Sequence, residues 1–378
     1  MRNQFLEKKM QAKMSPKSKK IFYIILFSVI AVVVILAITL GLVFGLKKDE
    51  KNKKEEEEVE IVDSYDNTDE LIQKYPVNNP TPVHDNIEKK IQNRLLTGFE
   101  NWNRGFKAWK KWGNILYTTE SIYNVHGCRL SLEHYQQAMD ISLQQSDIIM
   151  GDFHNMLIVD NYCAIHYDFT SNGQKSKVME FVRFKDYGEK LGTRVEEGWG
   201  STKDVSYDGL VYFQGDNEKR VQEEQIFHVL NYHIPDNEDD LNKKYPIKYK
   251  TTHSGENADL MLDIILHGFD AWNKGIEYYK TWVDSAYASD AKSSSLQEIE
   301  RTMEEYKQEM EELAANYEIK KLFFDNILIR DDWAALHYRY TRVDKTSTEE
   351  NKYAGDRMQF LKFQKNGDDL KIVASWIQ

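Results

Sequence analysis

The sequence lacks the short motifs that identify several large enzyme classes. It contains no G-x-x-x-x-G-K-S/T phosphate loop, no G-x-S-x-G nucleophile elbow, no H-E-x-x-H zinc motif and no C-x-x-C pair. Nucleotide hydrolysis by a phosphate-binding loop, α/β-hydrolase chemistry and zinc proteolysis of this type therefore lack their usual signatures. We predict no cofactor and no metal site.

Cysteine is scarce as well. Cys128 and Cys163 are the only two cysteines in 378 residues, so the chain cannot build a disulfide framework or a cysteine-based metal site. We interpret both as partly buried free thiols. The sequence also lacks an Asn-x-Ser/Thr sequon with a permitted middle residue, which disfavours a heavily glycosylated eukaryotic surface protein.

Negative charge outnumbers positive charge outside the first 20 residues. These hold seven Lys or Arg and one Glu, and the rest of the chain carries 43 basic and 60 acidic residues, a net charge of −17. Such an acidic surface repels phosphate backbones, so we predict no nucleic-acid partner for the folded part. Hydrophobic residues make up 41% and aromatic residues 12% of the chain, which is typical of a globular protein with a well-filled core.

One long hydrophobic run is present. Residues Ile21–Leu46 contain no charge over 26 positions, about 39 Å as a helix against a hydrocarbon core of about 30 Å. No short apolar region with a small-residue cleavage site is evident, so we predict an uncleaved transmembrane helix at residues 21–46. Seven basic residues precede it and five lysines follow it. This excess favours a basic cytoplasmic tail at residues 1–20 and extracytoplasmic C-terminal domains in a single-pass membrane protein.

A spacer follows the predicted membrane helix. Residues 47–83 combine the charge run KKDEKNKKEEEEVE with three prolines, a composition that cannot bury a core. We predict an extended segment that holds the globular part away from the membrane. Its charge run is interpreted as solvated, with an interaction tail as the alternative.

The remaining sequence contains an internal repeat. GFENWNRGFKAWKKW at residues 98–112 matches GFDAWNKGIEYYKTW at residues 268–282, at an offset of 170. NMLIVDNYCAIHYDFT at residues 155–170 matches NILIRDDWAALHYRYT at residues 326–341, at an offset of 171. Further blocks follow in the same order, which indicates a duplication.

The repeat defines two domains. All eight tryptophans lie inside the matched regions, and we place all six prolines outside them. We predict packed domains at residues 84–214 and 255–378, joined by a polar linker at residues 215–254.

Within each copy the hydrophobic period changes from helical to strand-like. Apolar positions in residues 91–109 and 262–283 step by three and four, which predicts one long amphipathic helix in each copy. A second helix is predicted after each. Residues 162–169 and 333–340 then alternate with a period of two, which predicts strands. Helices followed by an antiparallel meander indicate an α+β fold.

This order of elements resembles the nuclear-transport-factor-2-like superfamily, and within it the SnoaL-like, ketosteroid-isomerase-like branch. The resemblance depends on the aromatic-rich helices and on a final strand pair, RMQFLKFQKNGDDLKIVASW at residues 357–376. It implies two tandem cone-shaped domains, each with N-terminal helices packed on a curved antiparallel sheet around an apolar pocket. It also implies pairing through the sheets, here as an intramolecular pseudodimer.

The resemblance does not supply catalytic residues, because the acid/base pair that the family's enzymes keep in the pocket has no aligned counterpart here. We name His166, His154 and Asp152 as candidates. His166 and its counterpart His337 are the only histidines at equivalent positions in both copies. An imidazole that faces a pocket can act as a general acid or base, and the alternative is a hydrogen-bonded histidine of the sheet or an interface.

Several polar residues occur in one copy only. Asp152, His154 and Glu180 are matched in the second copy by Phe323, Asp325 and Gln359. An acid/base set built from the first three would therefore make one copy active and the other degenerate. Ordinary surface variation is the alternative explanation.

Aromatic residues on the helices are the predicted ligand-binding set. These are Phe99 and Trp102 in the first copy and Phe269 and Trp272 in the second. Glycines interrupt the same helices, at a cost of about 1 kcal/mol each relative to alanine. Either the helices pack tightly there, or the glycines leave room for a ligand against aromatic walls.

Our leading interpretation is a membrane-anchored tandem SnoaL-like protein that binds a small apolar ligand or a protein partner without catalysis. The alternative is an isomerase, cyclase or dehydratase that acts on an apolar carbonyl compound by general acid/base catalysis, with His166 or a neighbouring carboxylate removing the proton. A purely structural or adhesive module would have filled cones without a cavity.

Overall fold

The computed structural model describes residues 60–378 except 64–66, 85, 126–127, 146–147, 189–191, 201–226, 296–299, 347–351 and 368. The predicted membrane helix and the cytoplasmic tail lie outside this described part. Within the described part, no helix has both the length and the apolar character needed to cross a membrane.

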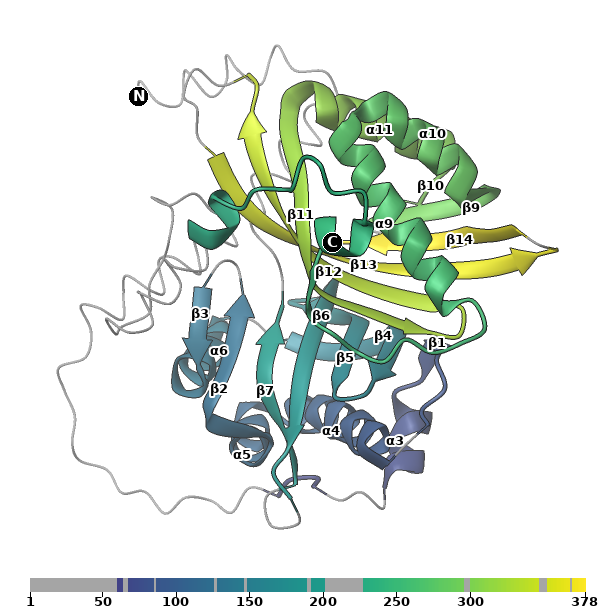
Figure 1. Cartoon of the computed structure of the whole chain (residues 1–378). Helices are drawn as coiled ribbons and strands as arrows, with labels where there is room; N and C mark the ends of the chain where they lie inside the picture. The colour runs from purple at the N-terminus through teal and green to yellow at the C-terminus, as the bar shows by residue number, and fades with distance from the viewer. Residues whose placement is uncertain are drawn as a thin grey trace, which may run out of the picture. The chain divides into compact units, whose positions relative to one another are not determined.

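The first copy consists of short N-terminal elements, three helices and a sheet (Figure 1). In chain order these are α3 (Thr68–Lys74), β1 (Val77–Pro80), α4 (Asn86–Asn103), α5 (Phe106–Leu116), β2 (Tyr117–Val125), β3 (Cys128–Ser131), α6 (Leu132–Gln145), β4 (Ile148–Val159), β5 (Tyr162–Ser171), β6 (Gln174–Asp186) and β7 (Thr193–Trp199).

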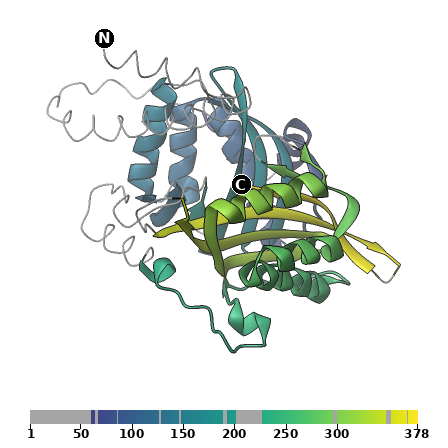
Figure 2. The same cartoon turned by 90° about the horizontal axis from the view of Figure 1, so that it is seen from above.

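The second copy repeats this order. Its elements are α8 (Leu241–Lys244), β8 (Ile247–Tyr249), α9 (Ala258–Lys274), α10 (Ile276–Ala286), β9 (Tyr287–Ser295), β10 (Glu300–Arg301), α11 (Met303–Asn316), β11 (Tyr317–Arg330), β12 (Trp333–Asp344), β13 (Lys352–Asn366) and β14 (Asp369–Ile377). Figure 2 shows the green helices of this copy along one face of its yellow-green sheet.

The two sheets have the same topology. The strand order is β1-β4-β5-β6-β7-β2-β3 in the first sheet, and the second sheet reads β8-β11-β12-β13-β14-β9-β10 in the same direction. In each, the long central strands pair antiparallel and an N-terminal strand adds in parallel at one edge. Helices that precede a mainly antiparallel sheet confirm the predicted α+β class.

The long helix predicted in each copy is wrong in one respect, because it is divided in two. Gly105 and Gly275 adopt φ values of 110° and 130° between α4 and α5 and between α9 and α10. This left-handed backbone region suits glycine and ends the first helix. The second helix of each pair then packs against the first, which a single continuous helix could not do.

Glycines inside the helices allow close packing. A Cβ on Gly98 would lie 2.6 Å from Trp112, and a Cβ on Gly268 would lie 2.5 Å from Trp282. Each glycine therefore accommodates an indole ring of the following helix. This agrees with the interpretation of tight packing.

Each copy begins earlier than the sequence analysis placed it. Residues 68–80 and 241–249, expected to be spacer and linker, form α3 with β1 and α8 with β8. The signal was present in the sequence: LIQKYPV at residues 71–77 matches LNKKYPI at residues 241–247 at the offset of 170. Tyr75-Pro76 and Tyr245-Pro246 therefore belong to the repeat, so the placement of these two prolines outside it is wrong.

Buried acids anchor these early segments. Tyr75 Oη donates a 2.8 Å hydrogen bond to Glu100 on α4, and Tyr245 Oη donates a 3.1 Å bond to Asp270 on α9. The lysine before each tyrosine pairs with the same carboxylate, at 2.6 Å in the first copy and 2.9 Å in the second. The segment is fixed by these polar contacts with a distant helix, together with its buried apolar residues, such as Leu71 and Tyr245.

The two faces of each sheet have different neighbours. On β5, Ile165 and Tyr167 pack with the helices of the first copy, while Tyr162 and Ala164 on the opposite face belong to another buried cluster. That second cluster contains residues of both copies: Leu157, Val159, Tyr162, Ala164, Met179, Phe181, Trp199, Leu328, Trp333, Ala335, Met358 and Phe360. Period-two alternation on β5 and β12 thus separates the helix-facing side from the side that contacts the other copy.

Candidate functional site

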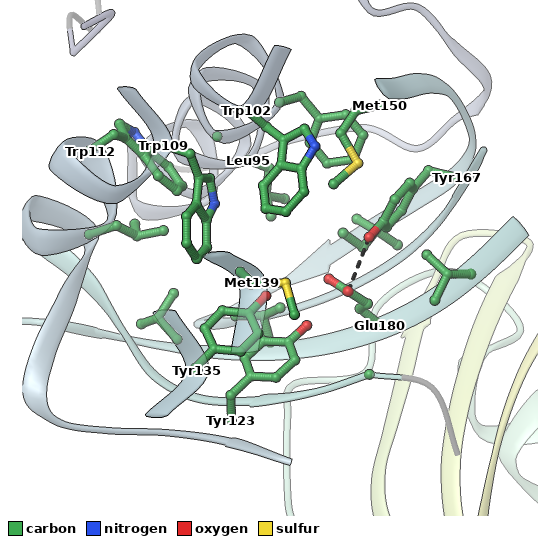
Figure 3. A pocket seen from close by; sticks show the side chains of 18 of the residues that line it. Leu95, Trp102, Trp109, Trp112, Tyr123, Tyr135, Met139, Met150, Tyr167 and Glu180 are labelled. Atoms are coloured by element: carbon green, nitrogen blue, oxygen red, sulfur yellow. Dashed lines mark hydrogen bonds between the residues drawn. The ribbon is translucent and has the colours of Figure 1, made fainter. Parts of the chain in front are cut away.

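A cavity lies in the first copy between α4, α5 and α6 and the inner face of its sheet. Its volume is about 310 Å³, at the lower end of the roughly 300–1,000 Å³ that small-molecule sites occupy. Aromatic and aliphatic side chains form most of the wall (Figure 3). Apolar walls lower the local dielectric constant, which strengthens electrostatic interactions inside a cavity.

The helices supply the aromatic part of this wall. Phe99 and Trp102 come from α4, and Trp109 comes from α5, where its ring meets that of Trp102 edge to face at 5.1 Å. The indole nitrogen of Trp102 donates a 2.9 Å hydrogen bond to the carbonyl of Ile148 on β4. This bond fixes the ring and satisfies its one polar atom.

Among the described residues that line the cavity, Glu180 is the one carboxylate. It lies on β6, opposite Ile165 of β5, and Figure 3 shows it beside the hydroxyls of Tyr123 and Tyr167. Tyr167 Oη donates a 3.1 Å hydrogen bond to its Oε1. Burial raises the pKa of Glu180, although both tyrosine hydroxyls act to lower it.

Tyr123 provides a second polar group in the cavity. Its ring stacks on Tyr135 at 4.3 Å between centroids, and a Cβ at Gly198 would lie 2.5 Å from the ring. Tyr123 Oη is enclosed and has no hydrogen-bond partner of normal geometry within the described residues. A buried hydroxyl without such a partner is costly, and a polar atom of a ligand would satisfy it.

The candidate acid/base residues from the sequence analysis do not line this cavity. His166 is buried on the opposite face of the sheet, where it accepts a 3.1 Å hydrogen bond from Asn155 and lies 6.4 Å from the ring of Phe360. Burial, together with the charges of His154 and Lys177, lowers the pKa of His166 to about 3, so it is neutral at physiological pH. It is a buried histidine of the sheet, the alternative given above.

The other two candidates also lie away from the cavity. His154 Nε2 donates a 2.7 Å hydrogen bond to Asp168, and Asp152 is exposed. The sequence signal for the acid was the alternation in β6, where Val178, Glu180 and Val182 point inward together. A single charged residue among alternating apolar positions of this strand predicts a buried carboxylate.

The second copy keeps the framework but changes the polar residues. Trp272 donates a 3.0 Å hydrogen bond to the carbonyl of Ile319, as Trp102 does to Ile148. Gln359 stands where Glu180 stands, and Lys321 stands where Met150 lines the first cavity. The predicted residues Phe269 and Trp272 therefore surround an amine, because their rings lie 5.0 and 5.1 Å from Lys321 Nζ.

A metal site is not evident in the described part of the chain. No group of three or more His, Cys, Asp or Glu side chains there is arranged to hold a metal ion. Cys163 is buried and not disulfide-bonded. In the same part of the chain, the polar side chains that line the first cavity are those of Glu180, four tyrosines and three tryptophans.

Comparison with known proteins gives matches in structure only. No protein-family model matches the chain, and no curated protein matches it significantly. A provisionally assigned hydroxylase from Streptomyces galilaeus is 15% identical over 32% of this chain and 88% of its own, with a TM-score of 0.28.

Two further solved structures carry the names that the sequence resemblance suggests. A provisionally assigned SnoaL-like polyketide cyclase from Mesorhizobium loti is 16% identical over 31% of this chain and 97% of its own, with a TM-score of 0.25. A ketosteroid isomerase-like protein from Erwinia carotovora atroseptica is 10% identical over 33% of this chain and 96% of its own, with a TM-score of 0.27.

Proposed function

We propose that the first copy binds a small, largely apolar carbonyl compound and that Glu180 transfers a proton on it. The observation that supports this is the single carboxylate in an apolar cavity, with a tyrosine hydroxyl at 3.1 Å and a raised pKa. A raised pKa makes the ionised form a stronger base and keeps the acid form available closer to neutral pH. The function is the catalytic alternative of the sequence analysis, with Glu180 in place of His166.

The proposed chemistry uses three groups. Glu180 removes a proton from the carbon next to the carbonyl and can return it to another position. Tyr123 Oη, which has no partner of normal geometry, donates a hydrogen bond to the oxygen that becomes negative. Tyr167 holds the carboxylate in place. Such hydrogen bonds act strongly in a cavity that excludes water.

The direct test is proton exchange of 2-tetralone in D2O, followed by NMR, with the full-length protein in detergent. Glu180→Gln introduces the residue of the second copy and keeps the shape of the side chain. We expect its exchange rate to fall about 100-fold or more, while binding of 2-tetralone persists. His166→Ala is the matched control, since it lies on the opposite face and should exchange at the normal rate. Equal exchange by wild type and Glu180→Gln would refute the role of Glu180.

A non-catalytic binding function is the second candidate. It is favoured by the mostly apolar wall of the cavity and by the glutamine at the equivalent position of the second copy. Trp102→Ala should then weaken binding of an apolar probe such as 2-tetralone, whereas Trp272→Ala should leave binding in the first copy unchanged. If the wild-type protein binds 2-tetralone but does not exchange its protons, the result supports the non-catalytic binding function, with a small apolar ligand or a protein as the partner.

We further propose that the two copies form an intramolecular pseudodimer through their sheets. Support comes from the buried cluster shared by both copies and from a buried ion pair between Glu88 and Arg330. A monomer in light scattering at micromolar concentration would agree with sheets that are already paired within one chain. A dimer that buries the same strands would contradict it.

We further propose that residues 21–46 anchor the protein in a membrane, with the globular part outside the cytoplasm. This proposal is supported by the uncharged run at residues 21–46 and by the basic excess before it. Protease added to intact cells should remove the globular part and leave a short membrane-bound fragment. Protection of the globular part would place it on the cytoplasmic side instead.

A further inference from the structure

The second copy contains an amine surrounded by aromatic rings. Lys321 lies on β11, and its Nζ is 5.0 Å from the ring centroid of Phe269, 5.1 Å from those of Trp272 and Tyr279, and 5.6 Å from that of Tyr338. These rings come from α9, α10 and β12, so three elements converge on one nitrogen.

Among the described residues, no counter-charge accompanies this amine. In the described part of the chain, no carboxylate lies within ion-pairing distance of Lys321 Nζ, and no acceptor is hydrogen-bonded to it. Its main chain is held firmly, because the side-chain amide of Asn273 accepts from Lys321 N at 2.9 Å and donates to Lys321 O at 2.7 Å. The side chain is half-buried, and Nζ is not among the fully enclosed polar atoms without a partner. The nitrogen is therefore not completely enclosed.

The surroundings leave much of this amine uncharged at neutral pH. Burial lowers the pKa of Lys321 to about 7, although aromatic faces favour the cation and oppose this effect. The titratable groups that face it are two tyrosines, Tyr279 on α10 and Tyr338 on β12. Tyr306 on α11 is hydrogen-bonded to Tyr279 at 2.9 Å. Burial raises the pKa of all three, so they contribute no charge near neutral pH.

We propose that Lys321 is a covalent binding site in the second copy for small apolar aldehydes and ketones. The lone pair of Nζ attacks the carbonyl carbon and forms a C–N bond as the C=O π bond breaks, and one N–H proton passes to the oxygen. Cleavage of the C–O bond then releases this oxygen, with the second N–H proton, as water and leaves an imine, so that amine plus carbonyl compound yields imine plus water. No oxidant or reductant is needed.

The four aromatic rings around Lys321 Nζ suit a protonated imine better than the free ammonium ion. An ammonium group has three N–H donors, and none has an acceptor among the described residues. A protonated imine has one N–H donor and still carries a positive charge that the four ring faces stabilise. The apolar walls select carbonyl compounds with hydrophobic substituents. This site goes beyond the proton transfer proposed for the first copy and does not require Glu180.

The test is reductive trapping in the full-length protein in detergent, with benzaldehyde and sodium cyanoborohydride at pH 7. Benzyl modification is followed by peptide mass spectrometry. We expect Lys321 to react at least tenfold faster than its exposed neighbour Lys320, with the advantage decreasing toward pH 10, where other lysines also lose their protons. Lys321 reacting no faster than Lys320, or not at all, would overturn the proposal.

Two variants separate this site from the first cavity. Lys321→Met introduces the residue type that the first copy has at the equivalent position, Met150. This variant should lose the fast benzyl labelling seen at Lys321. Glu180→Gln should leave labelling at Lys321 unchanged even if it stops proton exchange. Because the wild-type comparison of Lys321 with Lys320 uses no variant, the proposal stays testable if Lys321→Met does not fold.

Discussion

The two copies share a framework and differ in the polar residues that it surrounds. In both, a tryptophan on the first long helix donates to a strand carbonyl, at 2.9 and 3.0 Å, and an asparagine beside it pairs with the same strand. Yet the cavity of the first copy contains the acid Glu180, whereas the aromatic rings of the second copy surround the base Lys321. Contacts that fix the backbone persist, whereas residues that face a cavity are free to change the chemistry.

A second difference concerns the contact between the copies. Glu88 and Arg330 form a bidentate ion pair with distances of 2.5 and 2.7 Å, and both side chains are buried. By the offsets of the repeat, their counterparts are Ala258 and Val159. The duplication therefore has an ionic contact at one pair of equivalent positions and apolar residues at the other.

The largest expected effect comes from breaking this ion pair. Glu88→Ala leaves a buried arginine unpaired, and Arg330→Val leaves a buried carboxylate, so each should cost about 3–5 kcal/mol of unfolding free energy. The double variant has the residues of the equivalent positions and should recover at least half of that loss. Urea unfolding of all four proteins measures the cycle. Small and additive single effects would mean that the pair does not hold the copies together.

A smaller effect is expected from filling the helix glycines. Gly98→Ala and Gly268→Ala force a methyl group against Trp112 and Trp282, at a cost of about 1–3 kcal/mol that exceeds the gain of about 1 kcal/mol in helix propensity. If the two variants lose the same amount of stability in thermal unfolding, the contact between glycine and tryptophan is equivalent in the two copies. Gly113→Ala is the control, because its Cβ would meet nothing closer than 3.5 Å and should be neutral or stabilising.

The two titratable groups should give opposite dependences of stability on pH. The folded-state pKa of Glu180 lies above its ordinary value of 4.5, so the stability it contributes below that value is lost as pH rises through the folded pKa. The folded-state pKa of Lys321 is about 7, below its ordinary 10.5, so its contribution is lost as pH falls from 10.5 through 7.

Variants make these two slopes measurable. Relative to Glu180→Gln, the wild-type protein should become less stable as pH rises above 4.5. Relative to Lys321→Met, it should become more stable as pH rises from 7 to 10.5. Unfolding free energies from urea titrations across this range give both differences. Parallel curves for a variant and the wild type would show that the side chain titrates as it does in the unfolded chain.

Sequence reasoning located the repeat, the α+β order and the two faces of β5 and β12, because each of these depends on local periodicity. It missed the start of each copy, where LIQKYPV and LNKKYPI are held by hydrogen bonds to acids about 25 residues away. Sequence reasoning also predicted one helix where Gly105 and Gly275 separate two. The three-and-four spacing of apolar residues does not change at these glycines, so it gave no sign of the break.

Phe99 and Trp102, named from the sequence as ligand-binding residues, line the cavity, because a helical apolar stripe faces the sheet. That they bind a ligand stays a prediction. Glu180 was noted only as a residue present in one copy, and Lys321 was not considered. Alternation along a strand assigns a residue to a face, but it does not say which helices cover that face or whether they leave space.

The sequence by itself determined the duplication, the composition of each strand face and the exchange of glutamate for glutamine and of methionine for lysine between the copies. Only the tertiary structure decided that Glu180 lies in a cavity, that Lys321 lies among four rings and that His166 lies on the opposite face. The physical reason is that burial and the resulting pKa shifts depend on side chains contributed by elements far apart in the chain.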